Sequence, residues 1–313
     1  MSAGTEPVSG RVGRAPARPT DPPRRPPTNP RRWTFLGLSV PATLGLLAFL
    51  VAPLALMGSL SLHRELSPDL LGPFEPTLEQ YQQAASVGNY WQILQTSALI
   101  AFVVALAATA LAYPIAYFLA FRAGPRAGLY LILLLIPFWT SYLLRVMAWK
   151  LMLGNAGVIN STLTGLGIID EPLKGLLFSR NTVVVTLVYV WIPFATLPLL
   201  AVLGRIDVRL HDAAADLFAS PFQQFRRITL PLSLPGLAAA FLMVFIPTIG
   251  EYVTPLLVGG NAGIMYGNVI QDFFTRSGNW PLGSALSVVM LALTLALVVV
   301  GLRVVQPRRL LGR

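Results

Sequence analysis

The run ALSVVMLALTLALVVVG, residues 285–301, lies within a longer stretch, residues 277–302, that carries no charged side chain. The hydrocarbon core of a bilayer is about 30 Å thick, and a helix of about 20 apolar residues crosses it. The run shows no alternation of polar and apolar residues, which a membrane β-strand would require. It therefore predicts a transmembrane helix near the C-terminus.

Five further apolar runs have a similar length, three without a charge and two that continue past a single charged residue. A helix satisfies all its own backbone hydrogen bonds in lipid, so the sequence predicts an all-α membrane protein with six transmembrane helices. The predicted spans are about 33–60, 93–121, 127–149, 182–204, 237–258 and 282–302. Residues 151–169 are also uncharged, but they are rich in Gly, Asn, Ser and Thr, and we expect an external loop there.

The composition supports this class. Of the 313 residues, 55% are hydrophobic and 12% are charged, against about 25% charged in soluble proteins. A water-soluble fold of this length is excluded because its surface would lack charge. The chain has no cysteine, which excludes disulfides and thiolate chemistry. The two histidines, His63 and His211, fall on opposite predicted sides of the membrane, so both are expected to be solvated and no enzyme site is visible.

The loop charges predict the direction of the chain, because cytoplasmic loops carry the surplus of Lys and Arg. With both termini inside, the inner segments hold seventeen of these residues and the outer loops hold five. A seventh span at 151–169 would move the four arginines of residues 205–227 to the outside. The net charge of +10 is therefore mostly a topology signal, and it does not indicate nucleic-acid binding.

Both ends are expected to be cytoplasmic tails. Residues 1–32 are rich in Pro and Arg, so we predict a disordered basic tail that lies close to anionic headgroups. Residues 306–313 form a short C-terminal tail. Arg31-Arg32 before an apolar run resembles a twin-arginine export signal, but the uncharged run after it is longer than an ordinary signal.

The cytoplasmic loop 205–236 is far longer than a turn requires, so it should fold and contact something. RLHDAAADLF, residues 209–218, is a helix-forming sequence. Ser220-Pro221-Phe222-Gln223 then provides an N-cap, a proline at the first helical position and Gln three residues after the cap, which predicts a second short helix opened by a capping box. The alternative is an amphipathic hairpin that lies on the headgroups.

This loop resembles a known family. Asp212-Ala213-Ala214, then Phe218, then Ile228-Thr229-Leu230-Pro231 is similar to the E-A-A-x₃-G-x₉-I-x-L-P loop of permease subunits in binding-protein-dependent ABC importers. Asp212 stands for the usual Glu and Phe218 for the usual Gly, which supplies a positive φ freely. Three blocks resemble the spermidine/putrescine class: PFWTS with Arg145 and Trp149, GEYVTP through Gly259-Gly260, and NWPLGSA at 279–285. The resemblance covers about residues 33–305.

The resemblance implies a six-helix type I importer permease in the inner (plasma) membrane. It also implies four partners: a second homologous permease, two ATP-binding subunits and an extracytoplasmic solute-binding protein. ATP and Mg²⁺ would bind the ATPase, and this chain would hold no cofactor or metal; the sequence agrees in that it has no G-x-x-x-x-G-K-[ST] loop. The loop would be the coupling helix that contacts the ATPase, through Asp212, Ala213, Ala214, Phe218, Ile228, Leu230 and Pro231.

Two charges lie within the predicted spans, and charges at that depth are usually functional or paired. Arg145 and Glu251 fall at similar depth, so they could pair with each other, and Arg145 is expected to be structural. The alternative is that Glu251 helps to pass an organic cation by carboxylate and cation–π contacts. The tentative pathway residues are Glu251, Tyr252, Trp139 and Tyr142.

Other functions stay open at the level of sequence. Permeases for iron(III), phosphonates or other small solutes carry partly similar blocks. A secondary transporter that works without an ATPase would usually show internal repeats or several buried charges, and neither is visible. A membrane scaffold or sensor is compatible with the composition.

Overall fold

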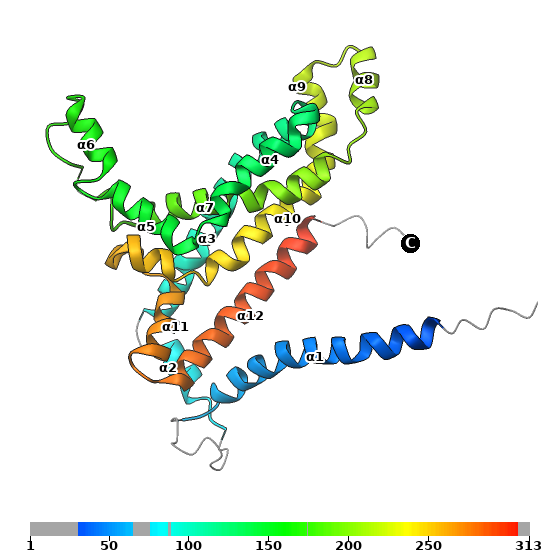
Figure 1. Cartoon of the computed structure of the whole chain (residues 1–313). Coiled ribbons are helices and arrows are strands. Elements are labelled where there is room, and N and C mark those ends of the chain that lie inside the picture. Colours follow the sequence, from blue (N-terminus) through cyan, green and yellow to red (C-terminus); the bar gives the residue numbers. More distant parts are fainter. Residues whose placement is uncertain (1–30, 65–75, 87–88, 174, 306–313) are drawn as a thin grey trace, which may run out of the picture. The chain divides into compact units, whose positions relative to one another are not determined.

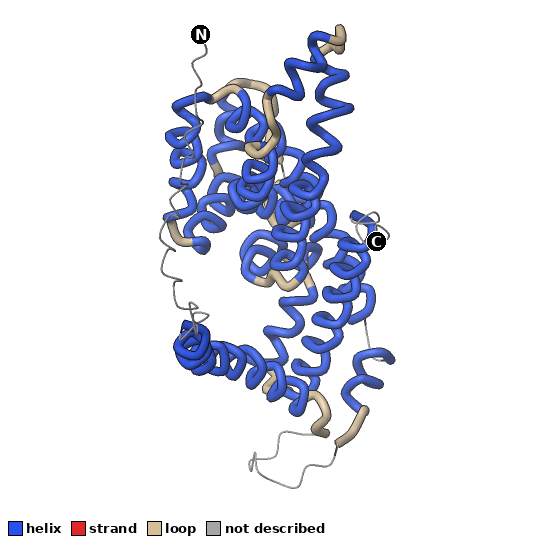
Figure 2. Tube along the Cα trace, turned by 90° about the vertical axis from the view of Figure 1, so that its right-hand side faces the viewer, coloured by secondary structure: helices blue, strands red, loops and turns tan. Residues whose placement is uncertain are grey.

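The computed structural model describes residues 31–64, 76–86, 89–173 and 175–305. The described chain consists of helices joined by short loops and turns (Figure 2). It divides into two units, Met1–Ala52 and Pro53–Arg313. The first helix, α1 (Arg31–Leu60), crosses this division. The predicted tail residues 1–30 and 306–313 lie outside the described residues.

Five helical segments of the described chain are long and apolar enough to cross a membrane. The helices are shown in Figure 1. The first segment lies in α1, at Thr43–Leu60, and the fourth combines α9, the π-helical turn η3 and α10. The five segments are Thr43–Leu60 of α1, α3 (Tyr90–Phe121), α7 (Arg180–Leu203), Pro221–Ile249, and Trp280–Arg303 of α12 (Trp280–Val305).

The predicted third span, 127–149, is not one straight helix. Helix α4 (Ala127–Leu135) passes into the 3₁₀ turn η2 (Ile136–Trp139), and α5 (Tyr142–Leu153) begins after Thr140 and Ser141. The two halves are bent by 84°. Pro137 has no backbone N–H to continue the helix, and Thr140 is extended, with its hydroxyl donating to the Pro137 carbonyl at 2.6 Å. Counting this bent pair as one span gives a sixth.

The predicted external loop at 151–169 also contains a helix. Helix α6 (Val158–Gly165) follows α5, and Asn160 is buried there. Its side-chain amide donates to the Gly154 carbonyl at 3.1 Å and its oxygen accepts from the Leu173 N–H at 2.9 Å. The Gly- and Asn-rich sequence therefore encodes a short helix with its connecting turns, where the composition predicted only a loop.

Helices α3, α7 and α10 (Leu230–Ile249) form the core. One face of α3 consists of alanines spaced three or four residues apart, and small side chains let membrane helices approach closely. Gly236 of α10 is an example of the same close packing, because a Cβ there would lie 2.9 Å from Val202 of α7. The fully buried alanines of α3 are Ala101, Ala105, Ala108, Ala112 and Ala116.

A second apolar cluster forms at the opposite end of the bundle from α8 and α9 (Figure 1). It joins the start of α3 to α11 (Tyr266–Thr275) and α12, and α2 (Glu79–Ser86) packs beside it. Tyr266 is buried here, and its backbone N–H donates to the Ser97 hydroxyl of α3 at 2.8 Å. This cluster positions α11 beside the end of α10.

The fifth membrane segment has different limits from the prediction of 237–258. Helix begins at Pro221 and continues without interruption to Ile249. The backbone then leaves the helix at Gly250 and forms a π-helical turn, η4 (Pro255–Gly259), and a 3₁₀ turn, η5 (Asn261–Gly263). The apolar composition of residues 250–258 suggested a longer span, but these residues are irregular and pack against α5 and α7.

Candidate functional site: a helical loop and a backbone break at the two ends of one helix

The loop after α7 contains the two predicted short helices. Helix α8 (Arg209–Asp216) is followed by α9 (Pro221–Gln224). Ser220 accepts from the Gln223 N–H at 3.3 Å, and the Gln223 side chain accepts from the Ser220 N–H at 3.0 Å. The predicted capping box is therefore confirmed, with Pro221 at the first helical position.

Phe218, which stands where the resembled family has Gly, adopts the left-handed conformation with φ of 60°. This conformation costs roughly 1–2 kcal/mol for a residue with a Cβ atom. The Phe218 side chain is 97% exposed, and Leu217 and Phe222 beside it are 82% and 69% exposed. The turn geometry is thus kept despite the substitution, and it presents an exposed apolar tip, which we define as Leu217, Phe218 and Phe222.

The loop is joined to the helix bundle by aromatic and polar contacts. His211 of α8 hydrogen-bonds the Thr229 hydroxyl at 2.9 Å and packs edge-to-face on Phe121 of α3. His211 is therefore half-buried and partnered, and the expectation that it is solvated is wrong. Phe225 of η3 packs on Tyr113 and Tyr117 of α3. A movement of α8 would be transmitted directly to the start of α10.

The predicted coupling residues divide into exposed and packed groups. Asp212 and Ala213 are exposed on α8 and Ala214 is half-buried, while Ile228 lies in η3, and Leu230 and Pro231 open α10. The η3 turn (Phe225–Thr229) has π-helical hydrogen bonding, a feature often found at functional positions. The second helix of the loop, α9, therefore forms one continuous helical segment with η3 and α10.

At the other end of that segment, α10 ends at Ile249, just before Gly250, and we call this interruption of the helix the break. The Glu251 side chain stabilises the turn that follows it. One oxygen of its carboxylate accepts from the N–H groups of Val253 and Thr254, at 2.8 and 3.1 Å. These are the orphan donors of the turn that follows, so Glu251 acts as an N-cap. Sequence reasoning missed this role, although a polar residue directly after a helix end and before a Pro255 turn could have indicated it.

Glu251 and Arg145 do not form an ion pair in the described chain. Tyr142 of α5 lies between them: its hydroxyl hydrogen-bonds Thr254 at 2.5 Å, and it interacts electrostatically with both charges. Of the two alternatives, the direct pairing is absent from the described chain, and Tyr142 interacts with both groups.

Of the four tentative pathway residues, the structure brings two together. Tyr142 lies beside Glu251, as described above. Trp139 is 81% exposed and Tyr252 is 42% exposed, and neither ring packs on another aromatic ring of the described residues. Tyr252 is fixed through its backbone, because its carbonyl accepts from the Asn268 amide of α11 at 2.7 Å.

Glycines allow the break to pack against its surroundings. A Cβ on Gly267 of α11 would lie 2.6 Å from the Gly250 carbonyl oxygen and 2.8 Å from that of Glu251. A Cβ on Gly259 would lie 2.9 Å from Val183 of α7. Gly260 has φ of 56°, a conformation that glycine adopts freely. The break is thus positioned by close backbone contacts from α7 and α11.

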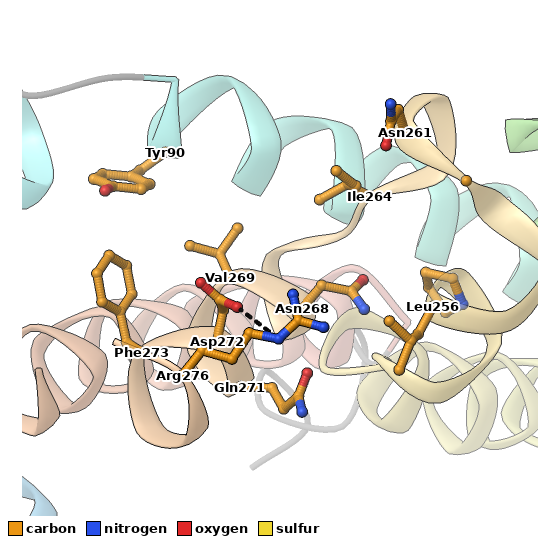
Figure 3. A pocket seen from close by; sticks show the side chains of 12 residues that line it. Tyr90, Leu256, Asn261, Ile264, Asn268, Val269, Gln271, Asp272, Phe273 and Arg276 are labelled. Atoms are coloured by element: carbon orange, nitrogen blue, oxygen red, sulfur yellow. Dashed lines mark ion pairs between the residues drawn. The ribbon is translucent and has the colours of Figure 1, made fainter. Parts of the chain in front are cut away.

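A cavity of about 510 Å³ lies beside the break, between α11 and η4. Figure 3 shows Asp272 of α11 beside Arg276, the residue that follows α11, with Phe273 facing Tyr90 of α3. Asp272 and Arg276 are paired at 3.6 Å on an exposed surface, a kind of ion pair that contributes little to stability. The lining combines aromatic, amide and charged groups, so the cavity can hold a polar molecule.

No cluster of His, Cys, Asp and Glu that could hold a metal ion occurs among the residues that the structure describes. The groups at the break and its cavity are a carboxylate, aromatic faces and amides, which suit the binding of a polar molecule.

Comparison with known proteins supports the same description. Residues 31–311 match the family described as "binding-protein-dependent transport system inner membrane component". The spermidine/putrescine transport system permease protein PotB of Escherichia coli (strain K12) is 38% identical over 201 residues, 64% of this chain and 73% of PotB. PotB of Haemophilus influenzae (strain Rd) is 35% identical over 227 residues, 72% of this chain and 79% of PotB.

Among solved structures, a bacterial ABC transporter that imports the acidic polysaccharide alginate aligns with a TM-score of 0.71 at 14% identity. The alignment covers 89% of this chain and 97% of the transporter chain, and at that identity it shows the shared fold. The chain therefore belongs to the binding-protein-dependent transport system inner membrane components, and it is a permease subunit of an ABC importer.

Proposed function

We propose that this permease passes polyamines, the linear diamines and triamines related to putrescine and spermidine, into the cell. The observation that carries the proposal is the 38% identity to a spermidine/putrescine permease over 201 residues. The chemistry at the break is compatible with it. An alkylammonium group is recognised by carboxylates and by aromatic faces, and Glu251 and Tyr142 lie together there.

The pathway would run past the break, along Glu251, Tyr252, Trp139 and Tyr142. Glu251 supplies a carboxylate at the break, so it would offset the desolvation of a passing ammonium. The exposed rings of Trp139 and Tyr252 would offer further aromatic faces. Arg145 repels cations at this depth, so its charge must be neutralised, or its side chain displaced, when a cation passes.

The loop with α8 and α9 would couple this path to ATP hydrolysis in a separate subunit. The coupling residues are those of the predicted loop, with the apolar tip in contact with the ATPase. Closure of the ATPase would displace α8 and α9, and the continuous helix to Ile249 would carry that displacement to the break at Gly250–Glu251. ATP and Mg²⁺ would bind in the ATPase, and this chain would be non-catalytic.

The complete importer would contain this permease, a second homologous permease, two ATP-binding subunits and an extracytoplasmic solute-binding protein. It would lie in the inner (plasma) membrane with both permease termini and the α8–α9 loop in the cytoplasm. A relative of the same fold is described in complex with a periplasmic protein that carries its cargo, which supports the binding-protein partner.

The test is uptake by the complete importer in proteoliposomes. Labelled putrescine should accumulate inside only when ATP and the loaded binding protein are both present. A complex whose ATPase subunit cannot hydrolyse ATP is the control and should show background uptake. Excess unlabelled spermidine should compete, and an uncharged sugar should not.

Binding of candidate solutes to the cognate binding protein checks the cargo class separately. Tight binding of diamines or triamines supports the proposal, and a purely acidic or purely sugar ligand set would overturn it. An iron(III) or phosphonate cargo would appear in the same measurement. Flux through the permease alone, without ATPase, would instead indicate a secondary transporter.

A further inference from the structure

The side chain of Arg145 has an unusual environment. Its guanidinium carbon lies 4.8 Å from the centroid of the Phe138 ring and 5.9 Å from that of Tyr142, both within the range of cation–π attraction. Its Nε atom is inaccessible to solvent and has no hydrogen-bond partner. No ion pair joins Arg145 to a described residue. Arg145 is thus half-buried, and the aromatic faces are the partners of its charge in the described chain.

The two rings belong to the two halves of the broken helix. Phe138 lies in η2 and Tyr142 in α5, on either side of the Thr140–Ser141 bend. Phe138 is itself fixed by Phe194 of α7, with ring centroids 4.2 Å apart and an edge-to-face angle of 83°. Phe194 in turn packs on Trp191. We call Phe138 and Tyr142 the aromatic box, which α7 supports from behind.

The aromatic box stands beside a carboxylate that Arg145 does not reach. Tyr142 interacts with Glu251 as well as with Arg145, and its hydroxyl is anchored on Thr254. Aromatic faces next to a carboxylate are the features that recognise an ammonium or guanidinium group of any origin. Leaving the buried Arg145 Nε atom without a hydrogen bond carries a desolvation cost that a merely structural arginine would avoid by pairing.

We propose that the aromatic box is an organic-cation site of the pathway, and that the chain's own Arg145 occupies it in the resting state as an internal substitute for cargo. This inference rests on the proposed function, because it places the box on the cargo path. An incoming alkylammonium group replaces the guanidinium on the rings, and Arg145 returns when the cargo leaves. The tethered cation thereby closes the path to cations when no cargo is being delivered.

The experiment measures leak through the complete importer in proteoliposomes without ATP and without binding protein. Labelled putrescine and tetramethylammonium are both used, because the quaternary cation cannot lose its charge and cross the lipid as a neutral amine. Arg145→Met removes the tethered cation, and the leak should rise about tenfold, the factor that loss of one strong cation–π contact allows. Arg145→Lys keeps a tethered cation and should leave the leak at the wild-type level.

A second pair of variants separates charge from packing. The chain has no cysteine, so Arg145→Cys can be modified at one known place. Reaction with 2-aminoethyl methanethiosulfonate attaches an ammonium group and should close the leak, whereas the neutral methyl reagent should leave it open. Wild-type complex treated with both reagents controls for cysteines of the partner subunits.

Phe138→Leu keeps Arg145 and removes one ring, so it tests the box even if the Arg145 variants fail to assemble. It should also raise the leak. Assembled Arg145→Met or Phe138→Leu complexes that leak no more than wild type would overturn the inference. A leak in Arg145→Lys as large as that in Arg145→Met would also overturn it. If the wild-type importer shows no ATP-dependent putrescine uptake, the cargo proposal is refuted. The tetramethylammonium leak of the variants would still test whether the aromatic box binds cations.

Discussion

The loop with α8 and α9 and the backbone break after α10 lie at the two ends of one continuous helical segment, Pro221–Ile249, and they keep their shapes by different means. The loop has a local support that needs no other element, the capping box of Ser220 and Gln223, in addition to the contacts of His211 and Phe225 with the bundle. The break is held by residues from distant elements, including Gly267 of α11 and Tyr142 of α5.

This difference fits the roles proposed for the two regions. A segment that transmits force to and from another subunit benefits from a shape that survives when its surroundings move, which local hydrogen bonds provide. A segment that opens and closes a path must change its contacts, so its conformation is best decided by elements that can themselves shift. The following predictions test the comparison, in order of decreasing effect.

The largest effect is expected at Glu251, where charge and capping can be separated. Glu251→Gln keeps an oxygen that can accept from Val253 and Thr254 but removes the negative charge. Uptake by the complete importer should fall to the level seen without ATP, while the complex assembles normally. Glu251→Ala also removes the cap and should lower the free energy of unfolding by about 1 kcal/mol more, measured by thermal melting in detergent.

Glu79→Gln is the matched control for this change. Glu79 forms an exposed ion pair with Arg64 at 2.9 Å, which should be worth about 1 kcal/mol or less. Its replacement should leave uptake unchanged. Normal uptake by the Glu251→Gln importer would remove Glu251 from the pathway and leave it as a cap only.

The next effect concerns the contact between α11 and the break. Gly267→Ala places a methyl group 2.6 Å from the Gly250 carbonyl oxygen, so the backbone must shift. The expected loss is about 1–3 kcal/mol, typical of overpacking, seen as a lower melting temperature. Gly128→Ala in α4 has nothing within 4 Å of the added methyl and should be neutral or slightly stabilising. Equal melting of the two variants would show that the break does not depend on this contact.

A smaller and local effect is expected for the capping box. Ser220→Ala removes the acceptor for the Gln223 N–H and should destabilise α9 by about 1 kcal/mol. Trypsin cleavage at the exposed Arg226 and Arg227 should then become roughly fivefold faster, because local opening is more frequent by that factor. Ser86→Ala, on an exposed hydroxyl of α2, should leave the rate unchanged. A rate equal to wild type in Ser220→Ala would mean that tertiary contacts, such as that of His211, hold the loop.

The smallest effect is expected at Phe218. Phe218→Gly removes the strain of the left-handed conformation, which stabilises the folded state, but it also increases the conformational entropy of the unfolded chain, which destabilises the folded state. Because the two effects nearly cancel, the free energy of unfolding should rise by less than about 1 kcal/mol, seen as a slightly higher melting temperature. Phe222→Gly, a change of another exposed aromatic residue, inside helix α9, should instead lower stability by about 1 kcal/mol. A clear loss of stability in Phe218→Gly would indicate that the Phe218 side chain packs on the loop.

Much of the fold could be predicted because it rests on local physics. Apolar runs between charges gave the helices α3, α7 and α12 to within a few residues, since no other backbone structure satisfies its own hydrogen bonds in lipid. Ser220, Pro221 and Gln223 indicated the start of α9 for a similar reason, because a cap is formed by residues within one turn. The family pattern indicated only that Phe218 stands at a usual Gly position, and the structure shows that Phe218 adopts the left-handed conformation there.

What the sequence did not reveal depends on contacts between residues far apart in the chain. The end of α10 at Ile249 and the partnership of His211 with Thr229 both require knowledge of which elements meet. An apolar run has the same composition whether it stays helical or unwinds against α5 and α11. The arrangement of Arg145 on Phe138 is of the same kind, because the bend at Thr140–Ser141 decides which rings can reach it.

By itself the sequence determined that this chain is a bundle of membrane helices with a folded loop between two of them, because hydrophobic run length, loop charge and helix caps act over short distances. The tertiary structure alone decided where the fifth helix stops, how Glu251 and Tyr142 come together and which groups surround Arg145. Those features depend on close packing between α5, α7, α10 and α11, and packing is a property of surfaces that only the folded chain brings into contact.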